Sequence, residues 1–233
     1  MTEIAGSTVL VTGGSRGIGK ALVEALYERG AKKVYATARD ASTVTHPDAV
    51  PLALEVTDPA AVAAVAAQAQ DVTVLINNAG YAVNASFLDS PIEDVRREFE
   101  TNFYGPLLTA RAFAPIIERN GGGHLLNVHS VLSWIALAGS YSASKAALWS
   151  QTNSLRLELA PRGIQVTGLH VGYVDTDLVA HIEAPKTTPV EVARQALDGI
   201  ATNAYEVLVD ELSRNVKAGL SGDLGGLYPQ LAG

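Results

Sequence analysis

Short apolar runs alternate with longer stretches of mixed polarity from one end of the chain to the other. Seven runs rich in β-branched or apolar residues have the length of strands, and they lie at residues 7–12, 33–38, 50–56, 72–77, 124–129, 164–171 and 205–210. Several are hydrophobic at nearly every position, which is typical of strands covered on both faces in a parallel sheet. The pattern therefore predicts a sheet buried between layers of helices.

Stretches of helical length separate these runs. They lie at residues 17–30, 58–70, 91–120, 140–163 and 188–203. Gly30 and Gly163 follow helical stretches, and Pro59, Pro91 and Pro189 stand near helix starts, where each residue type is favoured. The regular alternation of strand and helix predicts a doubly wound α/β fold with a seven-stranded parallel sheet and helices on both faces.

The chain shows neither an internal repeat nor a linker, so we expect one domain over residues 1–233. The glycine-rich tail, residues 219–233, has no clear hydrophobic period, so the sequence does not predict its structure.

A net charge of −7 gives no general electrostatic reason to bind nucleic acid or an anionic membrane. With no cysteine, disulfides and thiolate metal sites are excluded, and we expect no metal. No signal-like or membrane-spanning segment stands out, which favours a soluble cytoplasmic protein.

The first strand runs directly into TGGSRGIG, residues 12–19, and then into a helix. Gly13, Gly17 and Gly19 let the backbone turn sharply and approach a ligand, while the helix start offers N–H groups and a positive dipole end to a pyrophosphate. A purely structural turn is the alternative. In this position of an α/β pattern, however, the segment favours a dinucleotide site.

Tyr141 and Lys145 stand four residues apart in YSASK, so a helix would bring them together. A free tyrosine has a pKa near 10, too high for efficient proton exchange at neutral pH. We expect the neighbouring ammonium, together with the positive ring of an oxidised nicotinamide cofactor, to lower it. The small residues between the two are expected to leave room for a flat cofactor ring. The alternative is an ordinary pair of neighbours on a helix surface.

Taken together, these motifs resemble the short-chain dehydrogenase/reductase family. The loop has the form Gly-x-x-x-Gly-x-Gly after Thr12, NNAG follows at 77–80, and Asn102, Ser130 and YSASK come in the family's order. The resemblance spans roughly residues 7 to 180. It implies a Rossmann fold and a carbonyl reductase or alcohol dehydrogenase of the type that prefers NADP.

The resemblance also implies roles for four catalytic residues. Tyr141 would give a proton to the carbonyl oxygen that receives a hydride, Ser130 would polarise the same oxygen, Lys145 would hold the nicotinamide ribose, and Asn102 would position a water next to Lys145. With Tyr141 and Lys145 themselves, we expect the cofactor to contact Gly13, Ser15, Arg16, Gly17, Ile18, Gly19, Arg39, Glu55, Val56, Asn78, Ala79, Gly80, Val174 and Thr176.

The end of the second strand indicates which nicotinamide cofactor is used. An acidic residue there typically holds a ribose 2′-OH, but this chain has Ala38 followed by Arg39, with Arg16 in the glycine loop. Each arginine can make a charge-assisted hydrogen bond to a 2′-phosphate, worth on the order of 1.5–3 kcal/mol. We therefore expect NADP(H). Pairing of Arg39 with Asp40, or simple exposure to water, is the alternative.

The chain departs from the family pattern in its substrate region. Ser130 lies eleven residues before Tyr141 rather than the usual thirteen, with Ser133 as a weaker substitute, and Val171-Gly172 replaces Pro-Gly, which should loosen that loop. The expected lid, residues 178–189, is short. The candidate pocket walls, which could equally be core or oligomer contacts, are Trp134, Ile135, Leu137, Tyr173 and Leu178. We interpret His129 as a packing residue or as one that supports the catalytic residues from behind, and not as an alternative base.

The leading hypothesis is a reversible NADPH-dependent reductase of a ketone or aldehyde. A 3-oxoacyl thioester or steroid reductase is a narrower alternative, and a non-catalytic NADP(H) sensor is an alternative of another class. In this family, helices corresponding to 91–119 and 140–160 usually form a dimer interface, so we expect a homo-oligomer, either a dimer or a tetramer.

Overall fold

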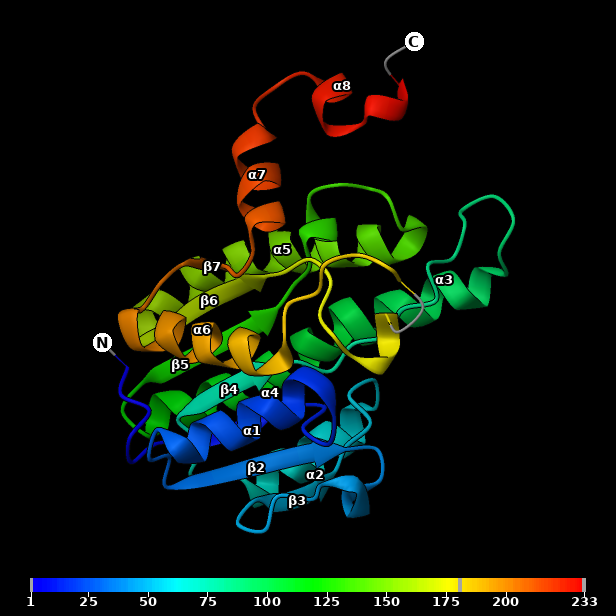
Figure 1. Cartoon of the computed structure of the whole chain (residues 1–233). Helices are drawn as coiled ribbons and strands as arrows, with labels where there is room; N and C mark the ends of the chain where they lie inside the picture. Colours follow the sequence, from blue (N-terminus) through cyan, green and yellow to red (C-terminus); the bar gives the residue numbers. More distant parts are fainter. Residues whose placement is uncertain (1, 180–181, 232–233) are drawn as a thin grey trace.

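Parallel strands form one sheet at the centre of the molecule (Figure 1). The computed structural model describes residues 2–179 and 182–231. Within these residues the strands are β1 (Thr8–Val11), β2 (Lys33–Ala38), β3 (Val50–Ala53), β4 (Val74–Asn77), β5 (Gly123–Val128), β6 (Ile164–His170) and β7 (Glu206–Leu208). Their order is β3-β2-β1-β4-β5-β6-β7 and every pairing is parallel, which confirms the predicted sheet.

Helices cover both faces of the sheet. One layer holds α1 (Gly17–Glu28) and α6 (Pro189–Thr202), and the other holds α2 (Pro59–Gln68), α4 (Gly105–Arg119) and α5 (Gly139–Leu159). Because side chains alternate along a strand, Val9 and Val11 of β1 pack toward the first layer and Leu10 toward the second. This two-sided burial explains why the strands are apolar at successive positions.

The stretch predicted as one helix over 91–120 has three parts. It begins with α3 (Ile92–Phe99), passes through one π-helical segment at Glu100–Tyr104, and continues as α4. A π-helical segment has hydrogen bonds from i to i+5 and is frequent at functional sites, yet it barely disturbs the apolar pattern of the sequence. The third strand is also shorter than predicted, because it ends at Ala53.

Two further helices follow β7 and were not predicted. These are α7 (Glu211–Gly219), capped by the Asp210 carboxylate, which accepts a hydrogen bond from Ser213 N, and the short α8 (Leu224–Leu227). Their apolar side chains pack against Val131, Trp134 and Ile135, in the loop before α5. None of the helices in the described part of the chain is both long enough and apolar enough to span a membrane.

The strand order locates the crevice in which a ligand can bind. Strands β1 and β4 are neighbours in the sheet, but the chain leaves them toward opposite faces. After β1 it enters α1 on one face, and after β4 it continues to α4 on the other face. In open α/β sheets, ligands bind outside the carboxyl ends of the strands where the chain diverges in this way. The glycine loop and the NNAG segment both lie at this point of the sheet.

Candidate active site

Hydrogen bonds lock the glycine loop to the NNAG segment. The Thr12 hydroxyl accepts from the backbone N–H groups of Asn78 and Ala79, at 3.0 Å each. The Asn78 side chain donates to the carbonyl oxygens of Thr12 and Gly13, at 3.0 and 3.1 Å. The Asn78 amide donors are therefore committed to shaping the loop, and any contribution of this residue to a ligand comes from its other atoms.

The loop has the close packing that a pyrophosphate cradle requires. A Cβ on Gly19 would overlap the carbonyl oxygen of Gly13, so only glycine fits there. Arg16, the residue before α1, makes no side-chain hydrogen bond to the helix start, which leaves the first N–H groups available to an anion. Gly17 faces Thr176, since a Cβ added to it would lie 3.0 Å from Thr176 Cγ2. These residues fit a dinucleotide phosphate.

The two candidate phosphate-binding arginines are both exposed. Arg39 stands at the end of β2, and the neighbouring Asp40 carboxylate accepts hydrogen bonds from the backbone N–H and hydroxyl of Ser42, at 3.0 and 2.7 Å. Arg16 reaches across the crevice to Asp177, at 3.7 Å, with both side chains more than 70% exposed. Asp40 caps its own turn and forms no ion pair with Arg39, so the exposed Arg39 side chain can face an anionic ligand.

The remaining residues predicted to contact the cofactor surround the same edge. Glu55 lies beyond the end of β3 and its carboxylate accepts from the Thr57 hydroxyl at 3.1 Å. Val56 is buried against Gly105, and Val174 is buried where it bridges Thr187. Ser15 and Ile18 are half-buried members of the glycine loop and the start of α1.

Tyr141 and Lys145 lie in the first two turns of α5, as the spacing predicts. The Lys145 Nζ atom is 5.8 Å from the centre of the Tyr141 ring and donates a 2.9 Å hydrogen bond to the carbonyl oxygen of Val128, at the end of β5. Lys145 is almost fully buried. A Cβ added to Gly80 would lie 3.9 Å from the same Nζ, so the NNAG segment and the Tyr–Lys pair converge.

The two serines between Tyr141 and Lys145 hydrogen-bond the backbone of α5 and of the residue before it. Ser142 and Ser144 are both buried. The Ser142 hydroxyl accepts from Ala138 N at 3.0 Å, and the Ser144 hydroxyl donates to the Tyr141 carbonyl oxygen at 2.8 Å. These hydrogen bonds give the two serines a structural part in the first turns of α5, and the space that small residues leave for a cofactor ring stays a prediction.

Ser130 approaches Tyr141 although the connection between them is short. It precedes a single 3₁₀ turn, Val131–Ser133, and its hydroxyl oxygen accepts from Leu132 N at 3.1 Å while hydrogen-bonding the Tyr141 hydroxyl. Ser133 is buried and its hydroxyl accepts from Ser130 N at 3.5 Å. The short loop thus keeps Ser130, rather than Ser133, beside the phenol.

Asn102 lies in the π-helical segment and is fully buried. Its amide nitrogen donates to the Tyr81 carbonyl at 2.8 Å and to the Ser144 hydroxyl at 3.0 Å, and its oxygen accepts from Tyr81 N at 2.9 Å. Both amide donors are therefore used within the protein. The side chain joins the segment after NNAG to α5, and a water-positioning role would have to use other atoms of the residue.

The pKa values in the site differ from the prediction. Burial raises the pKa of Tyr141 to about 12, against the hydrogen bond from Ser130, which lowers it. Burial also lowers the pKa of Lys145 to about 8. In the protein without cofactor, the Tyr141 pKa is therefore raised and not lowered, because desolvation is the largest effect. The Lys145 ammonium donates its hydrogen bond to the Val128 carbonyl oxygen and not to the phenol.

An aromatic stack behind Ser130 was not predicted. The His170 ring stacks on the rings of Trp134 and His129. The distances between ring centres are 3.9 Å to Trp134 and 4.6 Å to His129, and the three rings are nearly parallel. Burial lowers the pKa values of both histidines, that of His170 to about 4, so both are neutral at pH 7. His129 is thus a packing residue, as expected. Trp134 and Ile135 are buried beneath α7 and α8, and this packing reduces their availability as open pocket walls.

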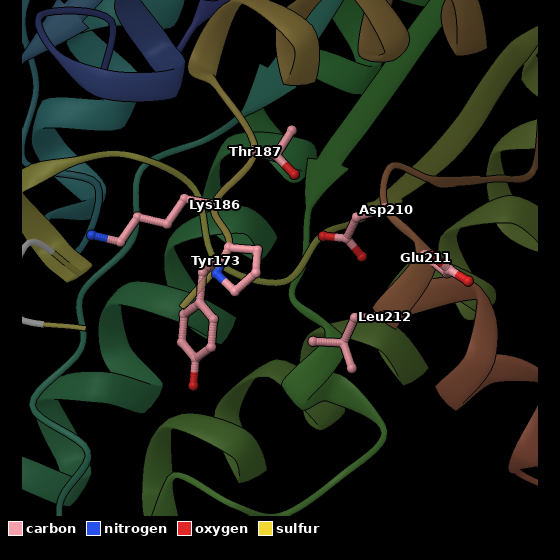
Figure 2. A pocket seen from close by; sticks show the side chains of 7 residues that line it. Tyr173, Lys186, Thr187, Asp210, Glu211 and Leu212 are labelled. Carbon is pink, nitrogen blue, oxygen red and sulfur yellow. The ribbon is translucent and has the colours of Figure 1, made fainter. Parts of the chain in front are cut away.

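The loop after β6 is held firmly despite lacking the family's proline. The Asp210 carboxylate accepts a 2.6 Å hydrogen bond from Gly172 N. Next to it is a cavity of about 220 Å³, shown in Figure 2, in which Lys186 points away from Asp210. The cavity is lined by Tyr173, Pro185, Lys186, Thr187, Asp210, Glu211 and Leu212. Part of the expected lid, residues 180–181, and the Leu178 side chain lie outside the described structure.

Comparisons with known proteins agree with this geometry. Residues 7–187 match the family described as short chain dehydrogenase. The structure resembles that of a short chain dehydrogenase from Burkholderia cenocepacia in complex with NADP, with 37% identity, 99% of each chain covered and a TM-score of 0.94.

Two sequence relatives carry more specific names. The ketoacyl reductase HetN of Nostoc is 30% identical over 232 residues, covering 91% of this chain and 81% of that protein. The NADPH-dependent 1-acyldihydroxyacetone phosphate reductase of Schizosaccharomyces pombe is 39% identical over 181 residues, covering 73% of this chain and 60% of that protein. With the family match spanning most of its length, the chain belongs to the short-chain dehydrogenase family.

Proposed function

We propose that the protein is an NADPH-dependent reductase that converts a ketone or aldehyde to an alcohol, reversibly. The observation that carries this proposal is the convergence of Tyr141, Ser130 and Lys145 beside Gly80 at the carboxyl edge of the sheet. A sensor that only binds a dinucleotide needs no half-buried proton donor with a hydroxyl partner. The reactive groups therefore favour catalysis over sensing.

The residues divide the reaction between them. NADPH supplies the hydride that the carbonyl carbon accepts when the cofactor is bound. The Tyr141 hydroxyl donates its proton to the carbonyl oxygen, and the Ser130 hydroxyl hydrogen-bonds the same oxygen as negative charge develops there. Lys145 places a positive charge next to the phenol and limits the cost of the phenolate left behind. In the oxidative direction each proton transfer runs in reverse.

NADP(H) is the cofactor in this proposal. The start of α1 has no side-chain cap, so its N–H groups are open to a pyrophosphate. Within the described part of the chain Arg39 has no ion pair, and Arg16 has only a 3.7 Å pair with the exposed Asp177. The NADP-bound relative has the same fold over 99% of its chain. A 2′-phosphate between two guanidinium groups would gain charge-assisted hydrogen bonds that a 2′-hydroxyl cannot make.

Arg39→Asp should reverse the cofactor preference. Losing one charge-assisted bond and adding a like charge should raise the KM for NADPH by roughly 100-fold, whereas the KM for NADH should stay within a few-fold of its original value. Steady-state kinetics with both cofactors measures this change. Arg96→Asp, at an exposed arginine of α3, serves as the matched control. Equal losses with both cofactors would contradict the assignment of Arg39.

The substrate region favours a carbonyl compound with an apolar portion. Leu137, in the loop before α5, and Tyr173, in the loop after β6, are both exposed. Tyr173 also lines the cavity of Figure 2, together with Leu212. A 3-oxoacyl thioester or similar acyl compound is the second candidate substrate. It is favoured by the likeness to a ketoacyl reductase and an acyldihydroxyacetone phosphate reductase.

A substrate panel tests the proposal directly. NADPH oxidation would be followed with aliphatic and aromatic ketones, aldehydes and a 3-oxoacyl thioester, with chiral analysis of each alcohol. We expect turnover with at least one simple carbonyl. Tight NADPH binding without turnover across the panel would favour the sensor instead, and turnover restricted to the thioester would favour the second candidate.

A further inference from the structure

A buried carboxylate lies next to the first turn of α5 but outside the groups that perform the chemistry. Glu98, near the end of α3, has no exposed surface. One carboxylate oxygen accepts hydrogen bonds from the backbone N–H groups of Val83, at 2.7 Å, and Asn84, at 2.9 Å. The other accepts from the Ser140 hydroxyl. All three partners are neutral, so the carboxylate is held by hydrogen bonds and not by a salt bridge.

These contacts dock the segment after NNAG onto the start of α5. The carbonyl oxygen of Ala85 accepts a 3.0 Å hydrogen bond from Ser140 N, and Ala85 is buried. Gly139 has a φ of +49°, and a Cβ there would overlap the Ala85 carbonyl oxygen, so a larger residue is excluded by both backbone and space. Glu98 is thus one of several contacts that meet at the residue immediately before Tyr141.

Packing alone does not account for a carboxylate in this place. Burying an ionised group is costly unless several donors satisfy it, and an apolar residue would leave two backbone N–H groups and a hydroxyl without an acceptor. The charge also acts on the catalytic group, because Glu98 contributes to raising the pKa of Tyr141. Its position therefore couples the 83–85 segment, the helix start and the phenol.

We propose that Glu98 is a positioning residue, which holds the first turn of α5 against residues 83–85 and thereby keeps the Tyr141 hydroxyl beside Ser130. The inference rests on the proposed function, because it concerns proton donation by Tyr141. With only ten residues between Ser130 and Tyr141, a displaced helix start would separate the two hydroxyls that must meet the same carbonyl oxygen.

The test compares four single variants for kcat, NADPH affinity and thermal stability. Glu98→Ala should lower kcat roughly 10- to 100-fold, since misplacement of a reacting group by about 1 Å can cost that much. NADPH affinity should stay within about two-fold, because the glycine loop does not contact Glu98. Glu98→Gln should restore most of kcat, since its amide oxygen still accepts from Val83 and Asn84 and its nitrogen can donate to Ser140.

Two further variants make the result decisive. Ser140→Ala removes only the hydrogen bond between the Glu98 carboxylate and α5, and it should lower kcat several-fold. If Glu98→Ala does not fold, this variant tests the inference in its place. Glu93→Ala, at an exposed carboxylate of the same helix, is the control and should leave kcat unchanged. A folded Glu98→Ala or Ser140→Ala protein with wild-type kcat would overturn the inference, as would failure of Glu98→Gln to restore activity. Wild-type protein without reductase activity would overturn the proposed function instead.

Discussion

Tyr141→Phe is expected to lower kcat for carbonyl reduction by about a thousand-fold or more, with little effect on NADPH affinity or melting temperature. Phenylalanine keeps the ring and its packing but removes the proton donor, and a positioned general acid typically contributes 10²- to 10⁴-fold to the rate. It also removes the Ser130 hydrogen bond from the site. The loss should therefore appear in kcat, with NADPH titration by fluorescence showing normal binding.

Tyr205→Phe provides the matched control. Tyr205 is 70% exposed, immediately precedes β7 and is not one of the residues assigned to the site. The control protein should turn over at the wild-type rate. If Tyr141→Phe retained more than about a tenth of wild-type kcat, another group would have to be the proton donor, and the proposed mechanism would be wrong.

Lys145→Met should abolish most activity and yet make the protein more stable. Lys145 is 4% exposed, and its pKa falls from 10.5 to about 8 because burial disfavours the ammonium. At 1.36 kcal/mol per pKa unit, holding the charged form in the folded protein costs about 3 kcal/mol. Methionine avoids this cost but loses the hydrogen bond to Val128, so we expect a net gain of about 1–2 kcal/mol at pH 7.

The pH dependence identifies the origin of this gain. Below pH 8 the lysine is charged in both the folded and the unfolded chain, and the full cost is present. Between about pH 8 and 10.5 the unfolded chain binds the extra proton, so wild-type stability rises relative to that of the variant. The advantage of Lys145→Met should therefore shrink with rising pH.

Urea unfolding of both proteins at several pH values between 7 and 10 measures the difference. The raised pKa of Tyr141 adds a loss of stability above pH 10 that is common to both proteins. Lys20→Met, at a half-exposed lysine of α1, should show no such trend. A stability difference that did not change with pH would contradict the explanation.

Much of the fold could be predicted because its signals are local. The β1 and β4 strands are apolar at three of their four positions because both faces of the sheet are buried. The glycine loop must be free of side chains where Gly19 meets Gly13. The pairing of Tyr141 with Lys145 follows from helical spacing alone. Their meeting with Ser130 depended on the family resemblance, because no local pattern reports a contact across the loop.

The parts that were missed depend on contacts between distant segments. The buried role of Glu98 and the stack of His129, His170 and Trp134 leave no periodic trace in the sequence. The π-helical segment around Asn102 adds one residue to a helical turn. This small change does not interrupt the apolar pattern of residues 91–120, so the sequence predicts one continuous helix there. For α7 a signal did exist: Asp210 stands at the N-cap, and Leu212, Val216 and Leu220 are spaced four residues apart.

The loop between Ser130 and Tyr141 rests on helices from a remote part of the sequence. The Lys217 ammonium of α7 lies 4.9 Å from the Trp134 ring and forms a 2.8 Å ion pair with Glu206, and the Tyr228 hydroxyl accepts a hydrogen bond from Ala136 N. The residues assigned to the chemistry thus lie in the middle of the chain. The side chains that support the loop beside them come from the segment after β6, which includes α7 and α8. Such a division allows the loop to be reshaped, by evolution or by design, through changes in α7 and α8 while the reacting groups keep their identities.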